Sequence, residues 1–126
     1  MARSGVVVTV DVRALRRRLE ELPEDVVDAL RRAIRLSSEA VRDDTKRRVR
    51  VDTGALRAGV RIVLDDEGLT ARVGWPEDAH YYARFQEFGT WRASAQPALQ
   101  PALEAERGRV RERITDEVRE SLRRRR

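Results

Sequence analysis

The sequence predicts an α+β fold: a small, mostly antiparallel β-sheet packed by a long helix, with a further helix at the C-terminus. Three observations lead to it. Short β-branched or alternating apolar segments lie at residues 5–12 and 60–75. An apolar periodicity of helical spacing runs over residues 24–48, and a second one runs over residues 98–122. At 126 residues, the chain is sized for one domain with one modest core.

The N-terminal segment is expected to form a strand and then a short helix. Residues 5–12, GVVVTVDV, are short and β-branched, which favours a strand. Asp11 can cap a first helix over residues 12–22, and Pro23 would end that helix.

The longest element is expected at residues 24–48. Glu24 and Asp25 suit the positive start of a helix. Ser37 and Ser38 are small residues on its apolar side, so another element could approach closely there. The apolar face itself comprises Val27, Leu30, Ile34, Val41, Thr45 and Val49.

A β-hairpin with one apolar face is expected at residues 60–75. Two alternating segments flank a turn at residues 66–68, and Pro76 follows the second segment. The expected apolar face comprises Val60, Ile62, Leu64, Leu69, Ala71, Val73 and Trp75.

An aromatic stretch follows the hairpin. Tyr81, Phe85 and Phe88 are spaced i, i+4 and i+7, so a helix would place all three rings on one face. Gly89 can end that helix, because glycine adopts the left-handed conformation at little cost. Residues 90–96 are expected to form a loop.

The last helix is expected over residues 98–122. Pro97 and Pro101 would open it, since proline is tolerated where backbone N–H groups lack intrahelical partners. Gly108 interrupts it at a cost of about 1 kcal/mol relative to Ala. Its apolar stripe is narrow: Leu99, Leu103, Val110, Ile114, Val118 and Leu122.

The composition indicates a thin core under a charged surface. Aromatic residues make up 5% of the chain and charged residues 39%. Such cores are often completed by neighbouring subunits. The chain has no cysteine, which excludes a disulfide framework and cysteine-based zinc sites. No apolar run approaches the 18 or so residues of a membrane span, and no signal-peptide segment is recognisable.

The net positive charge lies mostly at the C-terminus. Of the net charge of +5, residues 123–126 carry four, which leaves +1 for residues 1–122. A nucleic-acid binder usually has a basic face as well as a basic tail. Lys46 is the only lysine, so arginine supplies nearly all the positive charge.

Two segments resemble a family of bacteriophage proteins. YARFQEFGT at residues 82–90, followed by AQPALQPALEA at 95–105, is similar to the head–tail joining or tail-completion proteins of long-tailed phages. Members of that family also carry a Pro-Val-x-Thr-Gly-x-Leu-x-x-Ser-Ile segment before the hairpin. Residues 51–54, Leu56 and Arg57 match it, whereas Arg50, Gly59 and Val60 depart from it. With both segments, the resemblance covers nearly the whole chain.

The resemblance implies a structural virion protein of the neck or tail, assembled in the host cytoplasm, that completes the tail and joins it to the head. It implies self-association into a six-fold ring that docks onto neighbouring neck and tail-tube proteins, with no cofactor, membrane or catalysis. Residues 1–122 would form a single head–tail joining-like domain, and 123–126 an Arg-rich tail. The family-motif and core residues would be Asp52, Thr53, Gly54, Leu56, Tyr82, Phe85, Glu87, Phe88, Gly89, Pro97 and Pro101.

Two further sets of residues are candidates for contacts. Trp and Arg are enriched at interface hot spots, and the narrow stripe of the last helix suits a second subunit. The subunit-interface candidates are therefore Trp91, Arg92, Gln96, Val110, Ile114 and Val118. Transient contact with genomic DNA would fall to Arg123, Arg124, Arg125 and Arg126.

Two other functions stay open at this point. One is a DNA-binding accessory protein that acts through its Arg-rich segments. The other is a retroviral-type aspartic protease, because Val51-Asp52-Thr53-Gly54-Ala55 has the hydrophobic-Asp-Thr-Gly-Ala pattern. The preceding charged helix argues against a protease, whose motif follows an apolar strand. His80 is the only histidine, and no serine has a base nearby in the sequence, so the predicted catalytic and metal sites are none.

Overall fold

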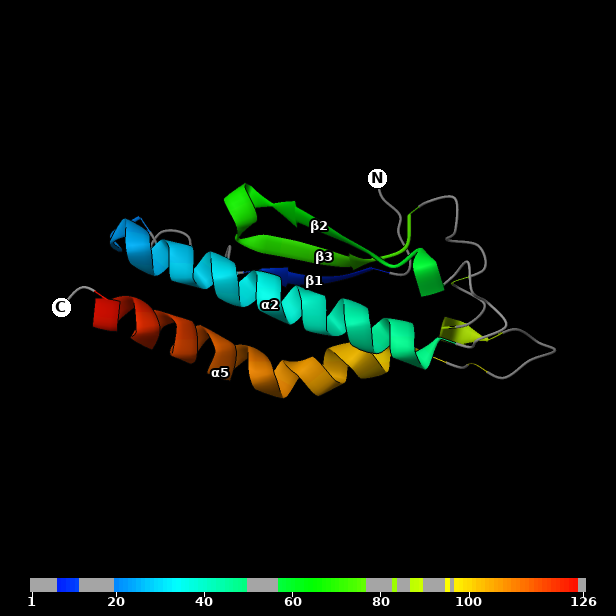
Figure 1. The fold of residues 1–126 in the computed structure, drawn as a ribbon. Coiled ribbons are helices and arrows are strands. Elements are labelled where there is room, and N and C mark those ends of the chain that lie inside the picture. The colour runs from blue at the N-terminus through cyan, green and yellow to red at the C-terminus, as the bar shows by residue number, and fades with distance from the viewer. Residues whose placement is uncertain are drawn as a thin grey trace.

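The structure is a computed structural model and describes residues 7–11, 20–49, 57–76, 83, 87–89, 95 and 97–124. Three strands form a sheet, a long helix lies across one face of it, and the C-terminal helix runs alongside the long helix in the opposite direction (Figure 1). The α+β prediction, with a C-terminal helix, is confirmed.

The sheet is antiparallel throughout. Its strands are β1 (Val7–Asp11), β2 (Arg61–Asp65) and β3 (Thr70–Gly74), in the order β1-β3-β2. The register places both Val7 and Arg61 opposite Gly74, and both Asp11 and Asp65 opposite Thr70. The central strand β3 is therefore paired on both sides, and β2 is an edge strand among the described residues.

The turn of the hairpin is η3 (Asp66–Gly68), a short 3-10 segment. Glu67 and Gly68 both have positive φ, at 56° and 89°. Arg31 holds this turn against the long helix: its Nε donates to the Glu67 carbonyl at 2.6 Å, and its guanidinium also contacts Asp28 and Glu24. The tip of the hairpin is thus tied to the helix.

The apolar face of the hairpin is only partly buried. On β3, Ala71 and Val73 are fully buried, as predicted. On β2, Leu64 is 45% exposed and Val63 on the opposite face is 49% exposed. Leu64 lies on the predicted apolar face, opposite Ala71, but it stays exposed because it sits on the edge strand while the covering helix packs mainly on β3.

Helix α2 (Glu24–Arg48) has the predicted bounds. Pro23 precedes it, and its carbonyl accepts the N–H groups of Val26 and Val27. Acidic residues lie in the first turn and basic residues in the last, each favourable to the helix dipole. Ser37 and Ser38 are fully buried, which confirms that small residues here admit a neighbouring element.

Helix α5 (Leu99–Arg124) is that neighbour of α2. It begins where Pro97 and Pro101 predicted and continues through Arg123 and Arg124, past the expected end at residue 122. The two helices run side by side (Figure 1). Helix α5 also contacts β1.

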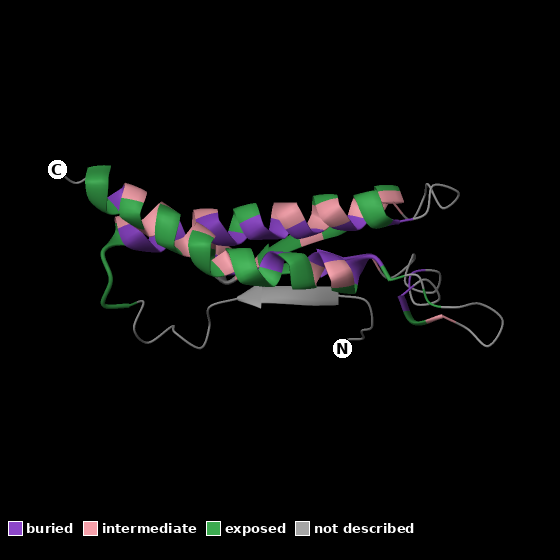
Figure 2. Cartoon of the chain, turned by 90° about the horizontal axis from the view of Figure 1, so that it is seen from below, coloured by how far each residue is buried: buried purple, intermediate pink, exposed green. Residues whose placement is uncertain are grey.

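The core lies where α2, β3 and α5 meet. One cluster joins Val41, Val73, Trp75 and Leu99 with further valines and alanines, and the second joins Val27, Leu30, Ile34, Leu69 and Ala71. Buried and half-buried residues follow the facing sides of the two helices, and exposed residues cover their outer sides (Figure 2). Each cluster thus draws on both α2 and the sheet.

The last three residues of the expected first helix over residues 12–22 are not helical. Residues 20–22 form a turn and bend, and Leu22 is 40% exposed, so Leu22 does not belong to a buried helical stripe. Residues 12–19 lie outside the described part of the chain.

Candidate assembly surfaces

Glu87 links the aromatic stretch to the C-terminal helix. Its carboxylate is buried, and it accepts the backbone N–H groups of Ala98 at 2.5 Å, Leu99 at 2.8 Å and Gln100 at 3.3 Å. Negative charge is favourable at a helix N-terminus, where these N–H groups have no intrahelical acceptor. The side chain from residue 87 is therefore the cap of a helix that begins 12 residues later.

Pro101 completes this cap. The first turn of a helix leaves several N–H groups without a partner, and Glu87 satisfies three of them. Proline at the next position has no N–H to satisfy. The Ala102 N–H then donates to the Ala98 carbonyl at 3.3 Å, and the regular ladder begins. Glu87 and Pro101 thus occur together because they account for the first backbone positions of α5 that lack an intrahelical acceptor.

Phe88 points to solvent beside this cap. It is 64% exposed, whereas its neighbour Glu87 is 6% exposed. Gly89 follows with φ of 76°, the left-handed conformation predicted for a helix stop. The prediction that Phe88 belongs to the core is wrong for the isolated chain, because the turn of helix that buries Glu87 directs the next side chain outward.

A buried polar contact joins α2 to α5. Ser37 donates its hydroxyl to Glu106 Oε2 at 2.7 Å, and Arg113 donates from Nε to the same oxygen at 2.5 Å. Glu106 is 3% exposed. The hydrogen bond to Glu106 holds the pKa of Arg113 above its usual value, so Arg113 keeps its charge. A second pair, Arg32 with Glu117 at 2.9 Å, joins the same helices further along.

The narrow stripe of α5 is partly used within the chain. Ile114 and Val118 are half-buried and pack against the cluster of Val27, Leu30 and Ile34. Val110 is also half-buried. Only part of the surface of these residues is therefore accessible to a second subunit. This corrects the expectation that the stripe serves mainly for contact with another subunit.

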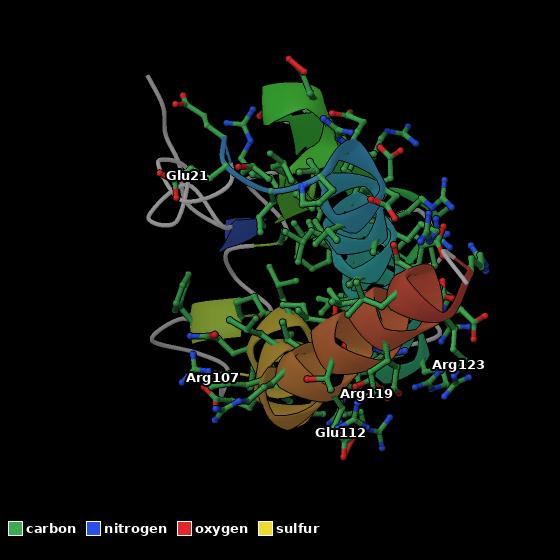
Figure 3. The ribbon with its side chains drawn as sticks, turned by 90° about the vertical axis from the view of Figure 1, so that its left-hand side faces the viewer. Glu21, Arg107, Glu112, Arg119 and Arg123 are labelled. Atoms are coloured by element: carbon green, nitrogen blue, oxygen red, sulfur yellow. The ribbon has the colours of Figure 1, made fainter. Side chains whose placement is uncertain are left out.

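The outer side of α5 is charged. Arg107, Glu112 and Arg119 project away from α2 and the sheet (Figure 3). At its end, Arg123 and Arg124 are exposed and both contact Glu120, at 3.2 Å and 3.6 Å. The first half of the Arg-rich tail is thus helical and partly neutralised by a neighbour on the same helix.

Two shallow hollows lie on the described surface. One of about 280 Å³ is lined by acidic and basic residues of α2 and α5, and Ser121 within it donates to Asp25. The other, of about 220 Å³, lies over β2 and β3. Across the described residues, no cluster of three or more His, Cys, Asp or Glu side chains could hold a metal ion. No described helix has the length and apolarity needed to cross a membrane.

Several predicted site residues lie outside the described part of the chain. Among the family-motif residues they are Asp52, Thr53, Gly54, Leu56, Tyr82 and Phe85. Among the contact residues they are Trp91, Arg92, Gln96, Arg125 and Arg126. His80 and the residues around it also lie outside it, so of the predicted motif the structure describes only Glu87, Phe88, Gly89, Pro97 and Pro101.

Comparison with protein families assigns these features to a family. A family model described as "Bacteriophage HK97-gp10, putative tail-component" matches residues 13–89. The chain belongs to the HK97-gp10-like family. The match contains α2, the hairpin and the segment up to Gly89, and it stops before α5, so it covers less than the predicted resemblance. Neither the comparison with curated proteins nor the comparison with solved structures found a match.

Membership in the HK97-gp10-like family makes this a bacteriophage tail component, a structural protein of the virion. The predicted family and the predicted structural role in the virion agree with this result. Glu87, Phe88 and Gly89 fall at the end of the matched region, and the helix that Glu87 caps lies beyond it.

Sequence reasoning did not find the buried contact of Ser37, Glu106 and Arg113. Glu106 stands four residues after Ala102 and seven after Leu99, both buried, so helical spacing places it on the inner face. That spacing was the available signal. A charged residue on an apolar stripe indicates a paired carboxylate in the helix–helix contact.

Proposed function

We propose that this protein completes the tail of a long-tailed phage and joins it to the head, through ring-like self-association and docking onto neighbouring virion proteins. The observation that carries the proposal is the family match over residues 13–89, which gives the coarser role of a tail component. The joining role rests on the additional likeness of the E-F-G-T segment and the Pro-opened helix to tail-completion proteins.

The surface of the chain supports a role in assembly. Phe88 is a large aromatic side chain left 64% exposed next to a rigid cap, and Val63 and Leu64 are also exposed. Exposed aromatic and aliphatic residues on an otherwise charged surface favour contact with other proteins. Hydrogen bonds to the start of α5 hold Glu87 in place, and Phe88 is the next residue. Phe88 is therefore presented from an ordered turn, so a contact with a partner would lose less conformational entropy.

The proposed assembly is a closed homomeric ring of six copies. Identical subunits joined head to tail close into a ring or grow into a filament. A protein at the end of a tail tube must match the rotational symmetry of the tube, and the number six comes from the resemblance to proteins of long-tailed phages. The ring would contact the tail tube on one side and a neck protein on the other, with no catalytic step.

Electron microscopy of particles that lack this protein tests the joining role. Full heads and separate, unattached tails are the expected products. Normal joined particles would overturn the proposal. The matched control is a particle complemented with the wild-type chain, in which joined virions should return.

Mass measurement tests the ring. The isolated chain is expected to form a ring in the presence of the tail-tube or the neighbouring neck protein, since the partner ring can act as a template. A chain that stays monomeric with and without these partners, even at high concentration, would contradict ring formation. The two experiments are independent, because electron microscopy measures head–tail joining and mass measurement gives the number of copies.

A transient contact of the C-terminal arginines with DNA is an additional proposal. Arg123 and Arg124 have side chains that are 72% and 64% exposed. Retention on heparin that falls when residues 123–126 are deleted would support it. Retention unchanged by the deletion would assign DNA binding to another part of the chain.

A further inference from the structure

The edge strand β2 exposes apolar side chains on both of its faces. Val63 is 49% exposed on the outer face of the sheet, and Leu64 is 45% exposed on the face that carries α2. The order β1-β3-β2 leaves the other long side of β2 without a pairing strand among the described residues (Figure 1). An unpaired edge presents backbone N–H and C=O groups that a strand from another chain can pair with.

The five residues of β2, Arg-Ile-Val-Leu-Asp, are complementary to themselves. If two copies pair antiparallel about Val63, Arg61 of each copy lies opposite Asp65 of the other. Residues 61, 63 and 65 share one face of a strand, so both charge pairs lie on the outer face of the sheet. Ile62 then lies opposite Leu64 on the other face.

The charges also discriminate against other pairings of this edge. A parallel, in-register pair of β2 strands would place Arg61 opposite Arg61 and Asp65 opposite Asp65. A parallel pair of β2 with β1 of another copy would place Asp65 opposite Asp11, two like charges. An antiparallel pair of β2 with β1 would make one pair of opposite charges, whereas the pair centred on Val63 makes two.

The groups at this edge are already held in place. Arg72 on β3 contacts Asp65 at 2.6 Å, so Asp65 is oriented on the outer face. Arg31 fixes the hairpin turn that follows Asp65. Arg61 is exposed and has no ion-pair partner among the described residues. A second copy would supply Asp65 to Arg61, and its own Arg61 would join the contact between Asp65 and Arg72.

We propose that β2 is the contact of a two-fold dimer of this chain, in which the two sheets join into one antiparallel sheet of six strands. This contact is isologous, so it is complete in a pair and is distinct from a head-to-tail ring contact. It does not depend on the proposed joining role. A paired edge also removes the hazard of aggregation that a bare apolar edge carries.

Single cysteines test the register. The chain has no native cysteine, so one introduced cysteine can cross-link only to its copy. Residues directly opposite lie about 5 Å apart between Cβ atoms, and diagonal residues lie about 7–8 Å apart. Val63→Cys is therefore expected to form disulfide dimers, and Leu64→Cys, which is similarly exposed, is the matched control and should cross-link at least tenfold less. Equal cross-linking of the two variants, or none in either, would overturn the register.

Charge reversal tests the pairing itself. Arg61→Asp alone and Asp65→Arg alone are each expected to weaken the dimer at least tenfold in sedimentation equilibrium, since each places like charges opposite one another. Mixing these two variants should restore dimers, because every opposite pair in the mixed dimer is again of opposite charge. Arg47→Asp, on the exposed side of α2, is the control and should leave dimerisation unchanged.

Circular dichroism melts establish that each variant is folded. Failure of the mixture to dimerise, with both variants folded, would overturn the antiparallel self-pairing. A wild-type chain that remains monomeric at millimolar concentration would overturn it as well. Headless tails or rings in virion preparations bear only on the joining role, so the two proposals can fail separately.

Discussion

The side-chain carboxylate of Glu87 accepts the backbone N–H of Leu99 at 2.8 Å and thereby caps α5 from outside that helix. Most helices receive such a bond from a residue that directly precedes the first turn. Here the cap comes from the segment at the end of the family match, so the position of α5 depends on the position of the aromatic stretch. Glu87 is for this reason the residue through which changes in that stretch would reach α5.

Replacing Glu87 should destabilise the chain in proportion to the acceptors removed. Glu87→Ala leaves three N–H groups of a buried helix start without their acceptor, so we expect a loss of about 2–3 kcal/mol in the free energy of unfolding. Glu87→Gln keeps one acceptor oxygen and should lose about 1 kcal/mol. Urea unfolding measures both.

The control for this pair of variants is Glu104→Gln, since Glu104 is exposed on the same helix and contacts Arg107 at 3.5 Å. Its effect should stay within about 0.5 kcal/mol. If Glu87→Ala were as mild as the control, the cap would not be a determinant of stability.

The contact of Glu106 with Arg113 predicts a non-additive pair of substitutions. Arg113→Met leaves a buried carboxylate without its cation and should cost about 2–3 kcal/mol, somewhat less than a fully buried pair because Arg113 is 28% exposed. The double variant with Glu106→Met and Arg113→Met removes both charges, so its free energy of unfolding should lie closer to that of the wild type. Thermal and urea unfolding of the single and double variants measure the difference.

A double variant that is less stable than Arg113→Met would contradict this account. It would mean that the hydrogen bond which the Ser37 hydroxyl donates to Glu106 at 2.7 Å contributes more to stability than the ion pair of Glu106 with Arg113 does. Ser37→Ala in the wild-type background measures that bond separately, with an expected loss of about 1 kcal/mol.

The start of α2, the hairpin turn and the start of α5 could all be predicted from local signals. Pro23 with the acidic residues after it, Gly68 at positive φ, and Pro101 each act within a few residues of the feature they specify. The buried face of α2 was likewise predictable, because periodicity over 25 residues averages out single exceptions.

Burial at the margins could not be predicted in the same way. Leu64 and Phe88 occupy positions with the right spacing, but their burial depends on how far α2 and the aromatic stretch extend over them, which is a tertiary property. The bond between Ser37 and Glu106 joins residues 69 positions apart, so no local pattern specifies it. The assembly surfaces are the part of the site that depends most on such distant contacts.

Phe88→Ala is expected to leave folding intact and to weaken assembly. Because Phe88 is 64% exposed, its side chain buries little surface within the chain, so the free energy of unfolding should change by less than about 0.5 kcal/mol. Assembly with virion partners, measured by co-sedimentation, should fall. The control is Leu122→Ala, since Leu122 is 47% exposed but lies at the far end of α5.

A large loss of stability in Phe88→Ala would instead indicate that the ring packs within the chain. For Phe85, a core position remains a prediction from spacing, and Phe85→Ala is expected to cost about 3–5 kcal/mol.

Deleting residues 123–126 should leave stability nearly unchanged. Arg123 and Arg124 both form exposed ion pairs with Glu120 on the same helix, and contacts of this kind contribute about 0.2–0.5 kcal/mol each. Thermal unfolding should therefore move by a degree or so, and retention on heparin should fall. A truncated chain that unfolds at a much lower temperature would mean that the end of α5 is held by more than these pairs.

Gly108→Ala is expected to stabilise the isolated chain. Gly108 lies inside α5 on its exposed side, and a Cβ added there would meet no atom within 4 Å. Alanine in a helix interior is favoured over glycine by about 0.8–1 kcal/mol, and no atom of the described residues lies close enough to oppose the added methyl group. The melting temperature should rise by about 3–5 °C.

Assembly of the Gly108→Ala variant is the second measurement. A variant that is more stable but no longer assembles would place a subunit contact on this side of α5, at a point where a second subunit approaches closely because glycine has no side chain. A variant that is less stable than the wild type would contradict the predicted helix at this position, and Arg109→Ala, at the next exposed position, controls for the loss or gain of a side chain on the same surface.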